Sequence, residues 1–275
     1  MLIDTEVPRL GQDYVSYTRR NHLISPDIID RALLKVSAKG FESPEDQAFF
    51  AVVMLSYYAG LRSDEVYSLS LDKITLYEPA YRDGEFGVGD KHHIAVKIIR
   101  GKTRNVKRTA NLHINAPAEI LADFVKLLAA RKAGKRKDCK LKHINLLGNK
   151  KDRAGYVSSA LKYAVMGRIR AAFGRHIDAH TLRHNFATWL DVRYQLLKTP
   201  NLQSILNIPT EHELFSDVSI NALKNYLNYG TPIRHAPYAS HHYNIIAMMM
   251  GHGSIATTHQ HYTHSFAVYG RLQNE

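Results

Sequence analysis

The chain carries the side chains that an attack on a phosphodiester requires. Arg62 and Arg183 supply guanidiniums, which hold two phosphate oxygens through paired hydrogen bonds. His180 and His252 supply imidazoles, which donate hydrogen bonds or move protons. Tyr262 supplies a phenol, a candidate covalent nucleophile. The five residues lie in four short strings: AGLRSDEV (59–66), HTLRHNFAT (180–188), MGHGS (250–254) and HQHYTH (259–264).

The positive side chains answer a specific chemical need. A phosphodiester is protected by its own negative charge, so a catalyst must neutralise that charge and fix the oxygens in place. His180 and Arg183 are three positions apart, so on a helix they share a face and approach the same phosphate. The arginines would do what metal ions do at other phosphoryl-transfer sites. The sequence therefore implies neither a metal nor any other cofactor.

The overall charge favours a polyanionic partner. The 275 residues include 37 Lys and Arg against 25 Asp and Glu, which gives a formal charge of +12. A basic surface attracts phosphate and releases condensed counterions, so the charge favours a nucleic acid as the partner. The alternative is a protein that is merely basic. A hydrophobic content of 45% predicts a folded chain with a substantial core.

The sequence carries no sign of export. Cys139 is the only cysteine, so neither an intrachain disulfide nor a cysteine-based zinc site forms, and a reducing cytoplasm fits. The opening residues MLIDTEVPRL lack the features of a secretory signal. The longest apolar stretch, FFAVVMLSYYAGL, is too short to span a bilayer. We expect a cytoplasmic protein with no membrane partner.

Helix signals surround the first arginine. Ser-Pro pairs followed by acidic residues predict helix starts at 25–27 and 43–46. The second of these helices is apolar nearly all round (AFFAVVMLSYYAG), which predicts a central position in the core. Gly60 is typical of a helix end. Arg62 would then lie at a junction between two helices.

The remaining elements are mainly helical. Residues 91–112 predict strands, with GKTRN as a turn, and Pro117 predicts the start of another helix. A basic run at 131–143 is either a solvated loop or a segment that follows phosphates. Further helices are expected at 157–173, 181–197, 217–229 and 241–250. The fold class expected is α+β, mainly α with a small antiparallel β-sheet.

These strings resemble the conserved boxes of the tyrosine recombinases, the phage-integrase family. AGLRSDEV is similar to the first arginine box, with Arg62 as the catalytic arginine and Glu65 as its supporting acidic residue. HTLRHNFAT is similar to the second box, whose His-x-x-Arg is His180 and Arg183. The resemblance covers roughly residues 25–268, and it depends on the order of the boxes rather than on any single one.

Two further segments complete the resemblance. MGHGSIATTHQHYTH is similar to the third box, with His252 and then the nucleophile Tyr262. RGKTRN is similar to the β-hairpin that carries the catalytic lysine, here Lys102. The resemblance implies the integrase catalytic-domain fold and an enzyme that integrates or exchanges DNA of mobile genetic elements, encoded by a bacterium or phage and associated with the nucleoid.

The resemblance also implies a role for each side chain. His180 assists proton removal from Tyr262, whose phenol is a poor nucleophile at its ordinary pKa near 10. His252 hydrogen-bonds a non-bridging oxygen in the transition state. Lys102 protonates the departing 5′ oxygen, and His184 supports the site from beside it. The product is a 3′-phosphotyrosyl link, which conserves the bond energy, so that strands are cut and rejoined without ATP.

Binding and assembly follow from the same resemblance. The resemblance implies double-stranded DNA as the partner and a homotetramer on paired DNA sites for full recombination, and it leaves open a monomer in the absence of DNA. Residues 265–275 would form a short tail that docks on a neighbouring protomer. Basic side chains outside the boxes are assigned to DNA binding: Arg104, Lys107, Arg131, Lys132, Lys135, Arg136 and Lys137.

The chain departs from the family pattern in two places. Arg183 and His252 are separated by more residues than is usual, so residues 194–240 are interpreted as an insertion. Residues 1–24 are interpreted as an arm or linker and 25–275 as the catalytic domain. Family members usually carry an N-terminal DNA-binding domain before the catalytic one, so the sequence is interpreted either as a fragment or as a member that holds DNA by other means.

Three other interpretations stay open. Histidines crowd around Tyr262, but their spacing is not His-Glu-x-x-His and no carboxylate lies among them, which argues against a zinc site. A type IB topoisomerase-like enzyme would use similar chemistry and would relax supercoiled DNA as a monomer. A decayed relative would bind DNA without cutting it. The histidines in question are His241, His242, His259, His261 and His264.

Overall fold

The computed structural model describes most of the helical chain and a small sheet. The described residues are 23–77, 91–99, 107–133, 140–141, 144–147, 157–199, 211–229 and 241–252. Its longer helices are α2 (Pro26–Ser37), α3 (Pro44–Ala59), α5 (Ala118–Ala133), α6 (Ser159–Phe173), α7 (Ala179–Lys198), α9 (Asp217–Tyr229) and α10 (His241–Met250). Short elements are α4 (Ser63–Tyr67) and the 3-10 turns η2 (Leu71–Lys73), η4 (Leu112–Ile114) and η6 (Glu213–Phe215).

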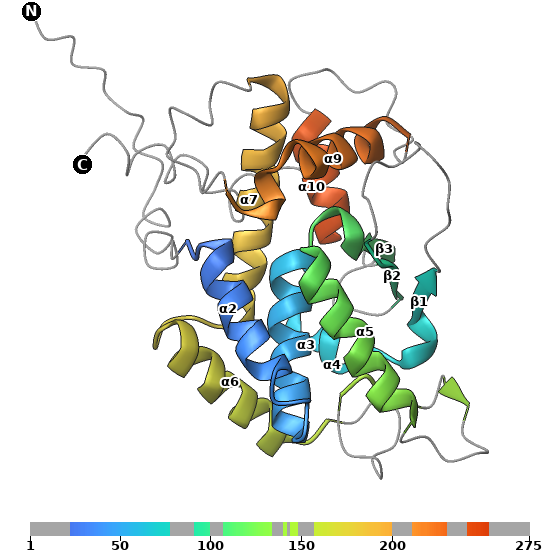
Figure 1. Ribbon diagram of the computed structural model, residues 1–275, viewed down its shortest axis with the longest axis vertical. Helices are drawn as coiled ribbons and strands as arrows, with labels where there is room; N and C mark the ends of the chain where they lie inside the picture. The colour runs from blue at the N-terminus through green and yellow to red at the C-terminus, as the bar shows by residue number, and fades with distance from the viewer. Residues whose placement is uncertain are drawn as a thin grey trace, which may run out of the picture.

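Helix α3 is the centre of the core, as its apolar sequence predicts. Its residues from Ala48 to Ala59 are buried, and it packs against α2, α5, α6 and α7 (Figure 1). Pro44 begins the helix, and the Ser43 hydroxyl accepts the Asp46 N–H at 3.0 Å. The helix ends at Gly60, where φ is +62°. A buried helix therefore delivers the next residues to a fixed point beside α7.

The three strands form one antiparallel sheet in the order β1-β2-β3. These are β1 (Ile74–Tyr77), β2 (His93–Ile98) and β3 (Arg108–Asn111), with Ile74 opposite Val96 and Ile98 opposite Arg108. The α+β prediction, mainly helical with a small antiparallel sheet, is confirmed for the part of the chain that the structure describes. Strand β1 was not expected, because three of its four residues are not buried and only pairing with β2 makes it a strand.

Residues 211–229 lie within the expected insertion and pack into the molecule. Leu214 and Phe215 of η6 join the main core, and Phe215 meets the Trp189 ring of α7 edge-on, with 5.6 Å between centroids. A second apolar cluster joins α7, α9 and α10, with Phe186, Leu190, Leu223, Leu227, Ile245, Ile246 and Met250 among its members. Helix α7 itself continues to Lys198, so the first residues assigned to the insertion extend that helix.

A buried arginine fixes this second cluster. Arg193 of α7 is 1% exposed and donates to Asn115 Oδ1 at 2.7 Å and to the Ile114 carbonyl at 2.9 Å. It also donates to the backbone and hydroxyl oxygens of Ser219, both at 3.0 Å. Burial lowers its pKa to about 9. One side chain therefore joins α7 to η4 and to the start of α9.

No described helix combines the length and the apolar character that crossing a membrane would require. The helix expected after Pro117 extends to Arg131 in the sequence prediction, and the structure continues it through Lys132 and Ala133, so the predicted basic loop at 131–143 is corrected at its start.

Candidate functional site

Arg62 occupies the junction between α3 and α4. Its backbone N–H donates to Glu65 Oε2 at 2.9 Å, so the glutamate reaches back to the start of its own short helix. Its Nη1 lies 3.0 Å from Glu65 Oε1, and the side chain is 22% exposed. The turn at Gly60 and the start of α4 thus hold this guanidinium in place while leaving part of it open to solvent.

Glu65 is a buried carboxylate among cations. Burial raises its pKa, but hydrogen bonds and charge from Arg108, the Arg62 backbone N–H and the charge of Arg183 outweigh burial and leave the pKa below its usual value. Arg108 Nη1 and Nη2 donate to Oε1 and Oε2 at 3.1 Å and 2.7 Å. Because one carboxylate faces three guanidiniums, the site keeps an excess of positive charge that suits an anion.

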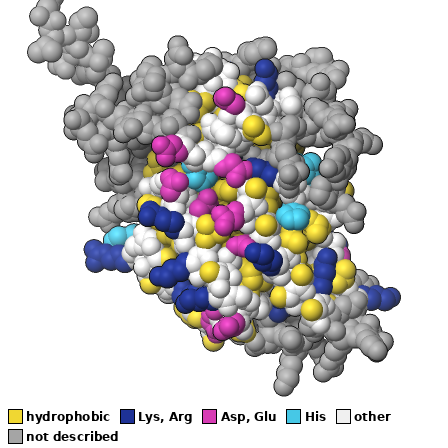
Figure 2. Space-filling model, in the orientation of Figure 1, with side chains coloured by type: hydrophobic (Ala, Val, Ile, Leu, Met, Phe, Trp, Pro, Cys, Tyr) yellow, Lys and Arg dark blue, Asp and Glu magenta, His cyan; other side chains and the backbone are white. Residues whose placement is uncertain are grey.

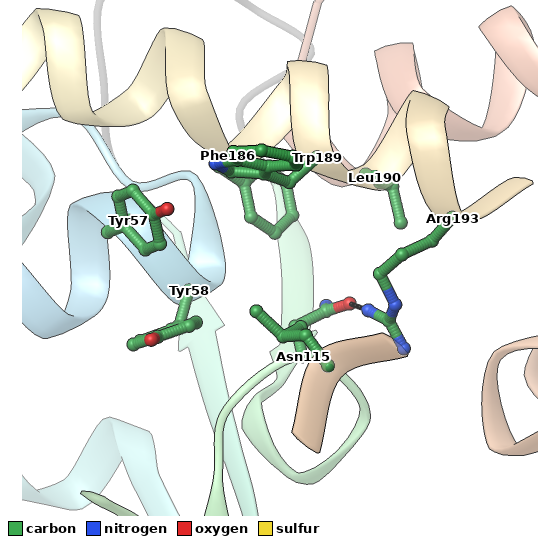
Figure 3. A pocket seen from close by; sticks show the side chains of 8 residues that line it. Tyr57, Tyr58, Asn115, Phe186, Trp189, Leu190 and Arg193 are labelled. Atoms are coloured by element: carbon green, nitrogen blue, oxygen red, sulfur yellow. Dashed lines mark hydrogen bonds between the residues drawn. The ribbon is translucent and has the colours of Figure 1, made fainter. Parts of the chain in front are cut away.

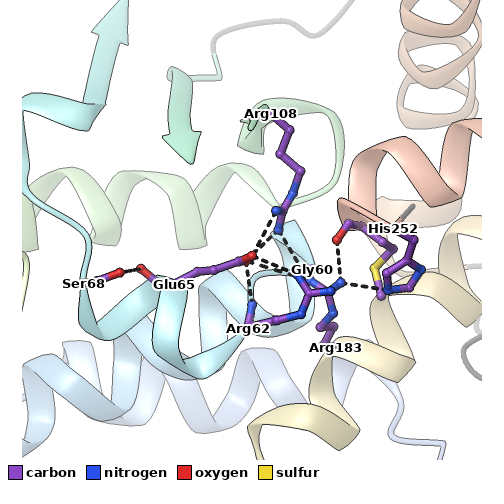
Figure 4. Close-up of polar contacts among 8 residues, drawn as sticks. Gly60, Arg62, Glu65, Ser68, Arg108, Arg183 and His252 are labelled. Atoms are coloured by element: carbon purple, nitrogen blue, oxygen red, sulfur yellow. Dashed lines mark hydrogen bonds and ion pairs between the residues drawn. The ribbon is translucent and has the colours of Figure 1, made fainter. Parts of the chain in front are cut away.

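Arg183 joins three separate parts of the chain. It is 0% exposed, and it donates through Nη1 to the Gly60 carbonyl and through Nη2 to the Met250 carbonyl. The same Nη2 lies 3.0 Å from His252 Nε2 (Figure 4). The ends of α3 and α10 therefore meet on the side of α7 that carries Arg183.

His252 is held as a neutral ring. Burial first, and then the charges of Arg183, Arg62, Arg108 and His180, together lower its pKa to about 3. A guanidinium only donates, so Nε2 is the acceptor from Arg183 and the ring proton is on Nδ1. His252 follows Gly251, whose φ of +66° ends α10. At neutral pH this ring supplies one hydrogen-bond donor without adding charge.

His180 and His184 lie on the first turns of α7. Asp178 begins the helix by accepting the Thr181 N–H at 2.7 Å. The two imidazole rings meet edge to face with 4.6 Å between centroids, and His184 is buried while His180 is partly exposed. The charge of His180 acts on His252, so His180 lies on the same side of the molecule as the arginine cluster.

The other predicted site residues lie away from the arginine cluster or outside the part of the chain that the structure describes. Lys107 is exposed just before β3, Lys132 is exposed on α5, and Arg131 donates to the Asn145 carbonyl at 3.0 Å. The following lie outside the described residues: Lys102, Arg104, Lys135, Arg136, Lys137, Tyr262, and the histidines 259, 261 and 264. Within the described ranges, no three His, Cys, Asp or Glu side chains are placed to hold a metal ion.

A small cavity between α3 and α7 is separate from the arginine cluster. Figure 3 shows its lining, where Asn115 accepts from Arg193 beside a group of aromatic rings. Its space suits a molecule the size of water, so it is no substrate site. The lining residues are Tyr57, Tyr58, Asn115, Phe186, Trp189, Leu190, Arg193 and Leu214.

Sequence reasoning missed Arg108 and the carbonyls of Gly60 and Met250. Arg108 stands in the basic string NVKRTAN, where nothing local separates it from Lys107. Strand alternation provides only a weak signal, since neighbouring residues of a strand point to opposite faces of a sheet. The carbonyls carry no sequence signal at all, because any residue supplies one.

Comparisons with protein-family models, with curated protein sequences and with solved structures found no match to this chain.

Proposed function

We propose that this chain is a tyrosine-type site-specific DNA recombinase that cuts and rejoins strands through a 3′-phosphotyrosyl intermediate on Tyr262. One observation supports this best: Arg62, Arg183 and His252, which come from three distant boxes, meet at one point. Arg183 contacts both the Gly60 carbonyl and the His252 ring. Convergence of motif residues from distant parts of the chain is the arrangement expected if they act on one group.

The charge of the cluster supports a phosphate as that group. Three guanidiniums surround one carboxylate, and the nearest imidazole is kept neutral. Such a site stabilises the charge that develops on a phosphoryl group in the transition state. The formal charge of +12 supports a polyanionic partner, and the proposal extends to duplex DNA, a homotetramer on paired sites, the cytoplasm, and the integrase catalytic-domain fold.

The test uses Arg62, which is partly exposed and so is suited to replacement. We expect Arg62→Ala to reduce covalent DNA cleavage by roughly 10²-fold or more, because the neutral alanine cannot stabilise the transition-state charge. Binding to nonspecific duplex should change little. The assay incubates the protein with randomly nicked genomic fragments from the source organism and counts complexes that survive detergent.

The control is Arg31→Ala, which removes an exposed arginine of α2 far from the cluster in sequence and should cleave like the wild type. Wild-type yields from a folded Arg62→Ala variant would contradict the proposal. Relaxation of supercoiled plasmid without exchange between paired sites would instead favour the topoisomerase-like alternative.

A further inference from the structure

Arg108 makes the closest ion pair of the cluster. Its Nη2 lies 2.7 Å from Glu65 Oε2 and its Nη1 lies 3.1 Å from Oε1, which gives the two-pronged arrangement that arginine forms with carboxylates. The two side chains are 7% and 1% exposed, so water screens the pair little. Figure 4 shows Arg108 approaching Glu65 from the side opposite Arg62.

Arg108 completes the hydrogen bonding of Glu65. An ionised carboxylate has about four acceptor positions. Arg62 occupies two of them through its backbone N–H and Nη1, and Arg108 occupies the other two. Arg183 Nη1 therefore stays 3.9 Å from Oε2, beyond hydrogen-bonding distance. Without Arg108, the Glu65 carboxylate would have two acceptor positions without donors, and it would attract Arg62 and Arg183 away from a phosphate.

Arg108 also supports the turn that carries His252. A Cβ added at Gly251 would lie 2.6 Å from Arg108 Nη1, so the backbone of this turn rests directly on the guanidinium. Arg108 Nη2 is 3.4 Å from the Gly60 carbonyl, which also accepts from Arg183. One side chain on β3 therefore touches both ends of the cluster, the junction before Arg62 and the turn before His252.

We propose that Arg108 is a positioning residue for DNA cleavage. It occupies two acceptor positions of the Glu65 carboxylate and supports the Gly251 turn, and these contacts hold Arg62, Arg183 and His252 around one phosphate. This inference rests on the proposed recombinase function. It adds a fourth segment, strand β3, to the three boxes that define the site. It assigns Arg108 no contact with DNA.

The experiment compares four variants, Arg108→Gln, Arg108→Lys, Glu65→Gln and the Glu65→Gln/Arg108→Gln double variant, in single-turnover cleavage of the nicked duplex pool. Arg108→Gln should cleave about 10²-fold more slowly than wild type, because the positions of the other groups shift. Arg108→Lys keeps the charge but loses the paired geometry, and it should fall between the two. Glu65→Gln combined with Arg108→Gln should lose less than the product of the single losses, because the two side chains act as a unit. Duplex affinity should stay near wild type throughout.

A second readout separates positioning from general stability. The charge of Arg108 is one of those that lower the His252 pKa, so in free Arg108→Gln protein that pKa should rise toward its ordinary value. In Arg108→Lys it should stay close to wild type. NMR titration of the His252 ring measures both without DNA, and Arg31→Gln is the matched arginine control on α2.

The outcomes distinguish this inference from the function on which it rests. Cleavage at the wild-type rate by folded Arg108→Gln, or by Arg108→Lys if the first variant does not fold, would overturn the role of Arg108 alone. A folded wild-type protein that forms no covalent complex would overturn both proposals. Slow cleavage with a raised His252 pKa would support the positioning role.

Discussion

At the scale of single residues, buried histidines make the stability of the fold depend on pH. His113 of η4 stacks on His93 of β2 with 4.3 Å between ring centroids and 1° between planes. Burial first, and then the charges of His93 and Lys91, together lower the His113 pKa to about 4. Both rings must therefore stay neutral for this stack to be stable.

Stability should fall as the solution becomes acidic. The unfolded His113 has an ordinary pKa of about 6.5, so below this pH the unfolded chain binds a proton that the folded chain does not. Its contribution is complete above pH 6.5 and is lost as the pH falls toward 4. The slope reaches at most about 1.4 kcal/mol per pH unit for one histidine. Urea unfolding between pH 5 and pH 7 should show a shallower slope for His113→Gln than for wild type.

His252 contributes to the same window, so the slope of His113→Gln should be reduced rather than abolished. Carboxyl groups such as Glu65 titrate mainly below it, since their unfolded pKa values are near 4. His176 is exposed on the loop between α6 and α7, and His176→Gln is the matched control. Identical slopes for His113→Gln and wild type would contradict the assigned burial.

At the scale of elements, α7 organises more than the arginine cluster. Ile24, which lies two residues before the start of α2, gives its N–H to Asn185 Oδ1 at 2.6 Å. Its carbonyl accepts from the Tyr57 hydroxyl at 2.7 Å and from Trp189 Nε1 at 3.1 Å. The helix that carries His180 and Arg183 thus also holds the chain where it enters α2.

Two replacements should differ in their effect on this junction. Asn185→Ala leaves the buried Ile24 N–H without its acceptor, at a cost of about 1–3 kcal/mol. Trp189→Phe removes one of two donors to the same carbonyl, so the hydrogen-bond loss should be smaller, about 1 kcal/mol. Urea unfolding at pH 7 measures both free energies. An Asn185→Ala variant as stable as wild type would show that the junction does not need this bond.

Some elements could be predicted from the sequence because their signals are local. The Ser-Pro start of α3, its apolar surface and the Gly60 ending all lie within a few residues of the helix that they define. Strand β1 could not, because its pairing with β2 spans residues that are distant in sequence. The sequence predicts α5 as far as Arg131, but its last two residues, Lys132 and Ala133, were assigned to a basic run that was interpreted as a loop.

The residues of the candidate site also divide into those that the sequence predicts and one, Arg108, that it does not. Arg62, His180, Arg183 and His252 were proposed from motif strings, and the structure places the arginines and His252 in contact with one another or with shared partners. Arg108 acts through Glu65, which lies 43 positions earlier in the chain, so no string contains both. The placement of Lys102 and Tyr262 stays a prediction.

At the scale of the whole molecule, the net positive charge is unevenly placed. Figure 2 shows acidic side chains gathered in the middle of one face, with Lys and Arg side chains around them. The chain nevertheless carries a formal charge of +12. Binding to DNA should therefore depend on particular basic side chains rather than on the average charge.

Neighbouring residues at the end of α5 test this idea. Lys132 is exposed, so Lys132→Gln should reduce the slope of log affinity against log salt by about 1 without changing stability. Arg131 donates to the Asn145 carbonyl, so Arg131→Gln should lower the free energy of unfolding and change the salt slope less. Fluorescence anisotropy on a nonspecific duplex gives the slopes. An unchanged salt slope in Lys132→Gln would show that Lys132 does not contact DNA phosphates.

The proposed recombinase activity depends most directly on the phenol of Tyr262. Wild-type protein should be incubated with the nicked duplex pool, denatured, digested with nuclease and trypsin, and analysed by mass spectrometry. We predict a nucleotide remnant joined through phosphate to Tyr262, and no covalent complex from folded Tyr262→Phe protein. A remnant on another residue, or a complex that persists in Tyr262→Phe, would contradict the account.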